Sequence, residues 1–212
     1  MPAGFFDLVR RRRVCRSFTS EPVADHHLWL LLEAARYATS ASNVRIHRFL
    51  VVRDAGRIRL VRLVSPGMLG EPTALIVICT DLRAASAADV HVDRDSTVLI
   101  DVGTAAMSMM LAAENLHLGA CPLTSFSRPA VSEVLELPEF AVPEFILQLG
   151  HCRPQRRVLP RSRKRGLSAA DLAYWERYGT RRHPAGPQHP PAAERQHPPA
   201  TEQQQPPATE PV

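Results

Sequence analysis

A dense arginine cluster near the start of the chain is the first feature that could do chemistry. Residues 10–16 hold five arginines in seven positions, set among Val14, Cys15 and Phe18, whose side chains favour burial. Arginine binds phosphate through paired hydrogen bonds, and arginines among apolar residues suit a buried phosphate better than a free tail does. We therefore expect an anion site here. A solvated basic face or a non-specific nucleic-acid patch is the alternative.

Two other segments have the composition of ligand-contacting loops. Residues 37–43 (Tyr-Ala-Thr-Ser-Ala-Ser-Asn) are small and rich in hydroxyl groups. In a loop they would offer hydrogen-bond donors to the carbonyl groups and ring nitrogens of a flat heterocycle. An ordinary polar loop at a helix end is the alternative. Residues 121–126 (Cys-Pro-Leu-Thr-Ser-Phe) follow a long apolar segment and form the second candidate.

The composition of the chain separates a folded region from a tail. The last thirty residues hold nine of the nineteen prolines and no aromatic residue, and Pro-Pro-Ala-x-Glu recurs there three times. Such a segment buries too little apolar surface to offset the entropy of ordering. We predict one domain over residues 1–182 and a disordered Pro/Gln-rich tail over 183–212. A polyproline-type ligand for a partner is the alternative for the tail.

The cysteine pattern and the start of the chain indicate the compartment. The four cysteines are widely spaced, with no C-x-x-C and no short-spaced Cys/His set, so the sequence supports neither a metal site nor a disulfide framework. No signal peptide opens the chain, and no apolar run reaches membrane length. We expect a protein of the reducing cytoplasm that binds no membrane.

Helix and strand patterns interleave along the chain. Helices are expected near 5–13, 25–35, 55–64 and 127–135, and strands at 49–52, 73–80 and 144–150. The strand at 73–80 is apolar without alternation, which is typical of a strand buried on both faces. This order predicts an α+β or α/β fold with a sheet covered on both sides.

The pattern of apolar residues over 95–119 predicts a long central helix. Apolar residues at steps of three and four share one face, and Ile100, Met107 and Leu111 make much of the other side apolar too. A helix that is apolar nearly all round is typically buried. Asp95 or Ser96 can cap its start, and Gly119 suits its C-terminal exit.

In this order, the segments resemble the nitroreductase family of FMN-dependent oxidoreductases. The family motif Arg-Arg-Ser-x-Arg-x-Phe/Tyr is matched by residues 12–18, with Val14 in place of Ser. The motif Ala-Pro-Ser-x-x-Asn-x-Gln-Pro-Trp-x-Phe is matched by residues 38–49, where Arg45-Ile46-His47 replaces Gln-Pro-Trp. A Leu-Gly helix exit, the Cys-Pro-x-x-x-Phe turn at 121–126 and Arg-Lys-Arg at 163–165 complete a resemblance that covers residues 5–180.

The resemblance implies an α+β nitroreductase-like fold, with a mostly antiparallel sheet and flanking helices around a long buried helix, in a homodimer with FMN at the interface. It implies contacts to the FMN phosphate and ribityl chain from Arg12, Arg13, Arg16, Arg163 and Arg165. It implies contacts to the flavin ring from Pro122, Leu123, Thr124 and Ser125, and from Ser40 and Asn43 of the other subunit. It assigns no catalytic side chain and no metal, because FMN carries the hydride.

The segment Ser65–Pro72 narrows the resemblance. With residues 39–43 and 119–126, it is similar to the large subunit of cyclodipeptide oxidases, which desaturate cyclic dipeptides and work with a small second subunit. Only residues 53–72 join the first two strands, which leaves little chain for a helical lid and fits a bulky secondary metabolite as substrate. A generic NAD(P)H-dependent nitro or quinone reductase is the alternative.

A function of a different class is a non-catalytic basic binding or scaffold protein. The net charge of +5 and the arginine cluster would suit nucleic acid. The aromatic content of 6% and the lack of a stacking platform disfavour this hypothesis. We therefore expect no nucleic-acid partner.

Overall fold

The computed structural model describes residues 4–92, 96–154 and 168–180, and the chain divides into two compact units, 1–156 and 157–212. In the second unit, the described part holds the short helix α7 (Ala169–Leu172), which begins with a capping box between Ser168 and Asp171. The predicted tail at 183–212 lies outside the described residues. The domain boundary at residue 182 therefore stays a prediction.

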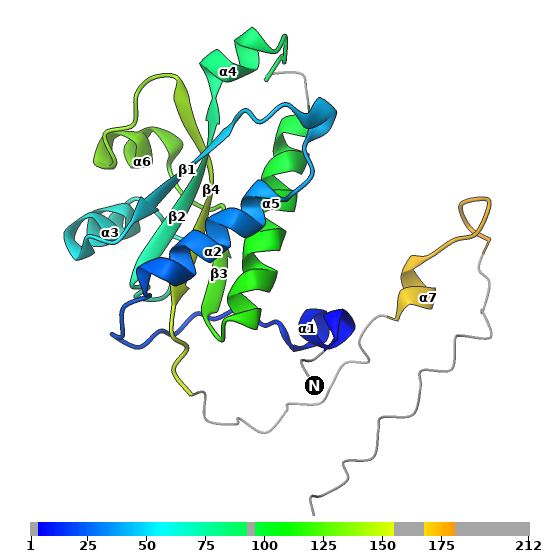
Figure 1. The fold of residues 1–212 in the computed structure, drawn as a ribbon, viewed down its shortest axis with the longest axis horizontal. Helices are drawn as coiled ribbons and strands as arrows, with labels where there is room; N and C mark the ends of the chain where they lie inside the picture. Colours follow the sequence, from blue (N-terminus) through cyan, green and yellow to red (C-terminus); the bar gives the residue numbers. More distant parts are fainter. Residues whose placement is uncertain (1–3, 93–95, 155–167, 181–212) are drawn as a thin grey trace, which may run out of the picture. The chain divides into compact units, whose positions relative to one another are not determined.

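A four-stranded antiparallel sheet forms the centre of the first unit (Figure 1). Its strands are β1 (His47–Val52), β2 (Ala74–Asp81), β3 (Gly119–Leu123) and β4 (Ala141–Gly150), in the order β1-β2-β4-β3. Every neighbouring pair in this sheet is antiparallel. The predicted α+β class is confirmed.

Helices cover both faces of the sheet (Figure 1). In the first unit they are α1 (Phe5–Arg11), α2 (Asp25–Arg36), the 3-10 turn η1 (Ala41–Asn43), α3 (Ala55–Leu63), α4 (Leu82–Ala87), α5 (Thr97–Asn115) and α6 (Arg128–Val134). Successive side chains of a strand point to opposite faces. On β2, Ile76 and Ile78 therefore pack in the cluster with α2 and α5, while Leu75 and Val77 pack with α3 and α6.

The central helix α5 is buried on one side only. Val102, Ala105 and Met109 lie in the core, whereas Leu99 and Ile100 are 57% and 60% exposed. By length and composition α5 could span a membrane, contrary to the expectation from the sequence. A core helix meets the same criterion, and α5 packs against α2 and the sheet. Within one chain, the predicted all-round burial therefore holds only for the side of the helix that faces α2 and the sheet.

The elements that the sequence did not predict include β3 and α4, and also the short helices η1 and α7. The predicted turn at residues 121–126 begins inside a strand, because residues 119–123 pair with β4 at the edge of the sheet. Asp81 starts α4 by accepting hydrogen bonds from the N–H groups of Arg83 and Ala84. The prediction that Gly119 ends α5 was wrong. His117 takes the left-handed conformation after the helix, with φ of 57°, and Gly119 opens β3.

Candidate functional site

The arginine segment runs beside the edge of the sheet. Val14 forms a parallel bridge with Ala120 of β3, and the Cys15 N–H donates to the Ala120 carbonyl at 3.0 Å. Phe18 bridges to Cys152 just after β4. Cys15 and Phe18 are 6% and 3% exposed, so burial of the apolar residues fixes the segment and leaves arginine side chains at the surface.

Two of the predicted arginines make no side-chain hydrogen bond or ion pair within the described part of the chain. These are Arg12, which is half-buried, and Arg16, which is exposed. Arg13 differs, since its guanidinium donates to the Arg12 carbonyl at 2.9 Å and to the Arg10 carbonyl. Arg12 and Arg16 therefore have the greater capacity to bind an external anion. Arg163 and Arg165 lie outside the described residues.

The loop from Ser65 to Pro72 packs against both the Arg16 backbone and the segment after β3. The Gly67 N–H donates to the Ser125 carbonyl at 3.2 Å. A Cβ atom on Gly70 would lie 2.7 Å from the Arg16 carbonyl oxygen, and one on Gly67 would lie 2.9 Å from Ser125 Cβ. Only glycine permits these approaches. The sequence analysis singled out this segment but missed the packing role of its glycines.

The predicted flavin-contacting residues after β3 divide into two groups. Pro122, Thr124 and Ser125 are exposed beside the glycine loop. Leu123 is 2% exposed and packs in the cluster with α3 and α6. Only the backbone of Leu123 could therefore face a ligand.

The loop that carries Ser40 and Asn43 is held on the first half of α5. Both carboxylate oxygens of Asp101 accept from the Ala41 N–H, at 3.1 and 3.0 Å, and the Thr104 hydroxyl donates to the Thr39 carbonyl at 3.0 Å. Asn43 is exposed in the left-handed conformation, with φ of 56°. Asp101 and Thr104 thus anchor the loop, a role that their spacing in the sequence did not reveal.

Opposite ends of α5 carry the two halves of the predicted site. The arginine segment begins at the far end, where Arg11 and Glu114 form an ion pair at 4.0 Å and α1 lies against α5 (Figure 1). Asp101 and Glu114 are thirteen residues apart, which corresponds to about 20 Å along a helix. One chain therefore does not bring Ser40 and Asn43 together with Arg12 and Arg16.

A cysteine pair links the arginine segment to the end of β4. Cys15 and Cys152 form a disulfide with a Cα–Cα separation of 6.0 Å, which corrects the expectation of no disulfide framework. Cys121 and Cys79 are free and buried, and burial raises the pKa of Cys79 to about 12. The spacing of the cysteines along the chain did not predict this pair, because the bridge between residues 14 and 120 brings distant cysteines together. Within the described ranges, no three His, Cys, Asp or Glu side chains could hold a metal ion.

An antiparallel sheet covered by helices defines an α+β protein, and the arginines beside its glycine loop that have no partner among the described residues make this edge the candidate anion site. A sequence profile described as the Nitroreductase family matches residues 9–75 and 62–151. The chain belongs to the nitroreductase family. This result confirms the family predicted from the sequence motifs.

Similar proteins include curated bacterial flavin reductases. The chain is 29% identical over 164 residues to "FMN reductase [NAD(P)H]" of Bacillus subtilis (strain 168), which covers 70% of this chain and 66% of that protein. It is 28% identical over 164 residues to "NADPH-flavin oxidoreductase" of Vibrio harveyi, which covers 73% and 68%. The chain thus spans about two thirds of the length of these relatives.

Solved structures show the same fold. A nitroreductase family protein from Clostridium difficile 630 superposes with a TM-score of 0.70 at 22% identity, which covers 82% of this chain and 99% of that one. The NfrA1 nitroreductase of B. subtilis superposes with a TM-score of 0.62 at 25% identity, which covers 74% and 71%. The predicted nitroreductase-like fold is therefore confirmed.

Proposed function

We propose that the protein is an FMN-dependent, NAD(P)H-dependent oxidoreductase that reduces small molecules. The observation that carries this proposal is the pair Arg12 and Arg16, whose side chains have no polar partner in the described part of the chain. Gly70 packs against the Arg16 backbone, and Gly67 of the same loop packs against Ser125 in the exposed segment after β3. Guanidinium groups without a partner suit the phosphate of FMN. The names of the curated relatives support FMN and NAD(P)H as cofactors.

The residues present fit this cofactor. Arg12 and Arg16 would hold its phosphate, whereas the contacts of Arg163 and Arg165 stay predictions from the family resemblance. The close packing of Gly67 and Gly70 lets the backbone at Thr124 and Ser125 approach a flat ring. FMN, when bound, supplies the hydride chemistry, whereas the protein binds and orients it.

A homodimer would complete the site. Ser40 and Asn43 lie about 20 Å along α5 from the arginine segment, so they would contact the FMN held by a second subunit. The exposed apolar side of α5, with Leu99 and Ile100, supplies a surface for that subunit. This arrangement supports the predicted contacts of Ser40 and Asn43 without moving either loop.

The cyclodipeptide oxidase hypothesis has weaker support. It rests on the sequence of residues 65–72, where Gly67 and Gly70 have a packing role that any flavin site of this shape would need. The second candidate function is therefore that of an oxidase subunit that acts on a cyclic dipeptide together with a small second subunit. We also propose a cytoplasmic location for the protein.

The first experiment is a visible absorbance spectrum of the purified protein, with the chromophore identified after heat release. Arg16→Ala should weaken FMN binding about 10- to 150-fold, because one charged hydrogen-bond partner contributes about 1.5–3 kcal/mol. Arg59→Ala is the matched control, since Arg59 is exposed on α3 without a polar partner in the described part. A colourless wild type that takes up no added FMN would overturn the proposal.

The substrate class is tested on the FMN-loaded protein. Bleaching of the flavin spectrum by NADPH in the absence of oxygen is the expected result. Bleaching by a cyclic dipeptide, with none by NADPH or NADH, would favour the oxidase instead.

A further inference from the structure

A cavity of about 510 Å³ lies between α2, α5 and the segment leading into β1. Much of its wall is apolar, and the contributing side chains are Leu32, Ala35, Ala38, Phe49 and Ala105. Small-molecule sites in proteins are typically 300–1,000 Å³ and mostly apolar, with a few placed polar groups. The cavity has this size and character, and it is separate from the arginine segment.

Polar atoms at this cavity lack hydrogen-bond partners. Ser40 and His47 both line the cavity. The Ser40 hydroxyl and both ring nitrogens of His47 are buried without a hydrogen bond of normal geometry. Burial lowers the pKa of His47, against the opposing influence of Asp101 and of the Cys79 and Val98 carbonyl groups. The Cys79 and Val98 carbonyl groups lie near the His47 ring, whereas the Ser40 hydroxyl has no such neighbour among the described residues. Since a buried polar group without a partner is costly, the Ser40 hydroxyl indicates an occupant with a hydrogen-bonding group.

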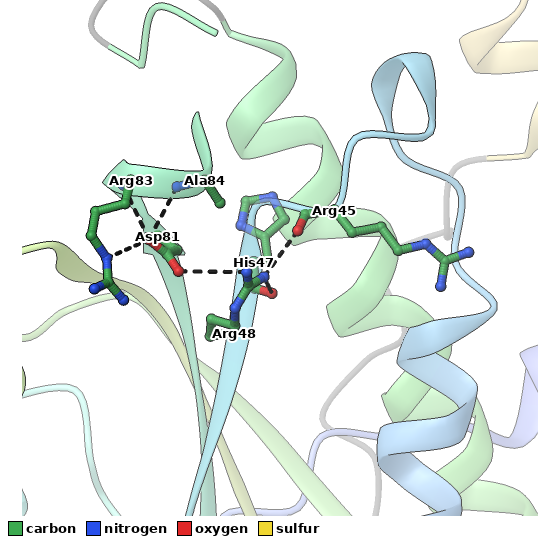
Figure 2. Close-up of polar contacts among 6 residues, drawn as sticks. All are labelled: Arg45, His47, Arg48, Asp81, Arg83 and Ala84. Carbon is green, nitrogen blue, oxygen red and sulfur yellow. Dashed lines mark hydrogen bonds and ion pairs between the residues drawn. The ribbon is translucent and has the colours of Figure 1, made fainter. Parts of the chain in front are cut away.

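The charges around the cavity favour an anion. Glu33 is paired with Arg36 at 2.8 Å, and the carboxylate of Asp101 accepts from Ala41. Arg48 is also engaged, by Asp81 at 3.5 Å and by two carbonyl groups. Figure 2 shows Arg48 within this network, while the Arg45 side chain extends away from it. Of the described residues lining the cavity, Arg45 is the cation without a polar partner.

The cavity coincides with a departure from the family motif. His47 stands where the motif has Trp, and Arg45 stands where it has Gln. An imidazole is smaller than an indole, so the exchange leaves space between α2 and α5. The second exchange adds positive charge beside that space.

From these contacts we infer that the cavity binds a small aromatic carboxylate, at a site away from Arg12 and Arg16 that shares only the Ser40 loop with the proposed FMN contacts. The ring would pack between Leu32, Phe49 and Ala105, and the carboxylate would pair with Arg45. The Ser40 hydroxyl or the His47 ring would bond a polar substituent. Ser40 also belongs to the loop proposed to contact FMN, so a bound acid would restrict the conformation of that loop.

The test is calorimetric titration of the FMN-loaded protein with 1-naphthoate. Saturable binding is expected, and His47→Trp should weaken it at least tenfold by filling the cavity. Arg45→Gln should weaken 1-naphthoate about tenfold but leave neutral 1-naphthalenemethanol unchanged. Arg59→Gln, which removes a charge far from the cavity, should change neither affinity.

The variants also separate this site from the FMN site. FMN content and the unfolding midpoint should stay at wild-type values in His47→Trp and Arg45→Gln. Ala38→Leu narrows the cavity from the other side and replaces His47→Trp if that variant does not fold. Absence of binding, or equal affinity in the cavity variants and the wild type, would overturn the inference even where FMN binding is intact.

Discussion

At the scale of single residues, the polar side chains of this protein fall into those already engaged and those left available. Asp81 and Asp101 are engaged, since each accepts backbone N–H groups that begin a helix or hold a loop. Arg12, Arg16 and Arg45 have no polar partner among the described residues. Binding capacity therefore lies with the arginines, and the carboxylates have structural roles.

Asp81 gives a prediction about acid stability. The Ala84 N–H lowers the pKa of this carboxyl, and the Arg83 N–H, Arg48 and the Arg83 guanidinium lower it further, against desolvation. Since the folded-state pKa lies below the ordinary 3.8, the stabilisation is present above that value and is lost as the pH falls through the lower one. Asp81→Ala should lower the thermal midpoint at pH 7, and its difference from wild type should shrink below about pH 4.

Thermal unfolding of both proteins from pH 7 to pH 3 measures this effect. Asp81→Asn is the control, because it keeps a capping acceptor but loses the ion pair with Arg48 (Figure 2). Its midpoint at pH 7 should lie between those of Asp81→Ala and wild type. A difference between wild type and Asp81→Ala that is the same at every pH would contradict the explanation.

At the scale of elements, the edge of the sheet positions the residues of the proposed anion site. The arginine segment pairs with β3, the glycine loop packs on both, and the cysteine pair closes the contact with the end of β4. A Cβ on Gly119 would lie 2.7 Å from Cys15 Sγ, so only glycine fits beneath the cysteine pair. The position of Arg16 thus depends on backbone contacts that span most of the chain.

The cysteine pair gives the prediction at this scale. Without reductant, the unfolded protein should expose two thiols, those of Cys79 and Cys121. After reduction of the disulfide it should expose four. Cys15→Ser should destabilise the oxidised protein by about 2–4 kcal/mol, because the disulfide restricts the unfolded chain. Thiol titration and urea unfolding with and without reductant test both parts.

The control for that experiment is Cys121→Ser, which removes a free thiol and keeps the disulfide. Its stability should fall on reduction as that of the wild type does, whereas the stability of Cys15→Ser should not depend on reductant. Four free thiols before reduction would mean that the pair is reduced as isolated. That outcome would agree with the expected reducing cytoplasm, where disulfides are uncommon.

At the scale of the whole molecule, the exposed half of α5 is the feature that one chain leaves unexplained. Leu99, Ile100 and Met107 lie on a helix whose other side forms the core, and the proposed homodimer would cover them. Ile100→Asp should convert a dimer to a monomer, because a buried unpaired charge is strongly unfavourable at an interface. Light scattering after gel filtration measures the change.

FMN content is the second measurement on this variant. If the site needs two chains, Ile100→Asp should lose FMN affinity at least tenfold together with the dimer. Leu63→Asp is the matched control, since Leu63 is 81% exposed on α3, on the opposite face of the sheet. A monomeric wild type with full FMN binding would rule out the interfacial site.

The sequence by itself determined the local features of this protein. Helix periodicity predicted α2, α3 and α5, a continuous apolar run predicted β2, and ordered motifs identified the family. These features depend on residues close together in the chain, where periodicity and propensity act directly. The arginine segment was predicted as an anion site for the same reason.

Only the tertiary structure decided which distant segments meet. Pairing with β4 made a strand of Gly119–Leu123, the bridge at Val14 brought Cys15 to Cys152, and α5 separated Ser40 from Arg16. The cavity beside His47 likewise depends on the packing of α2 against α5. Each outcome is a long-range contact between segments whose own sequences permit several conformations, so only the competition for partners in the folded chain selects one.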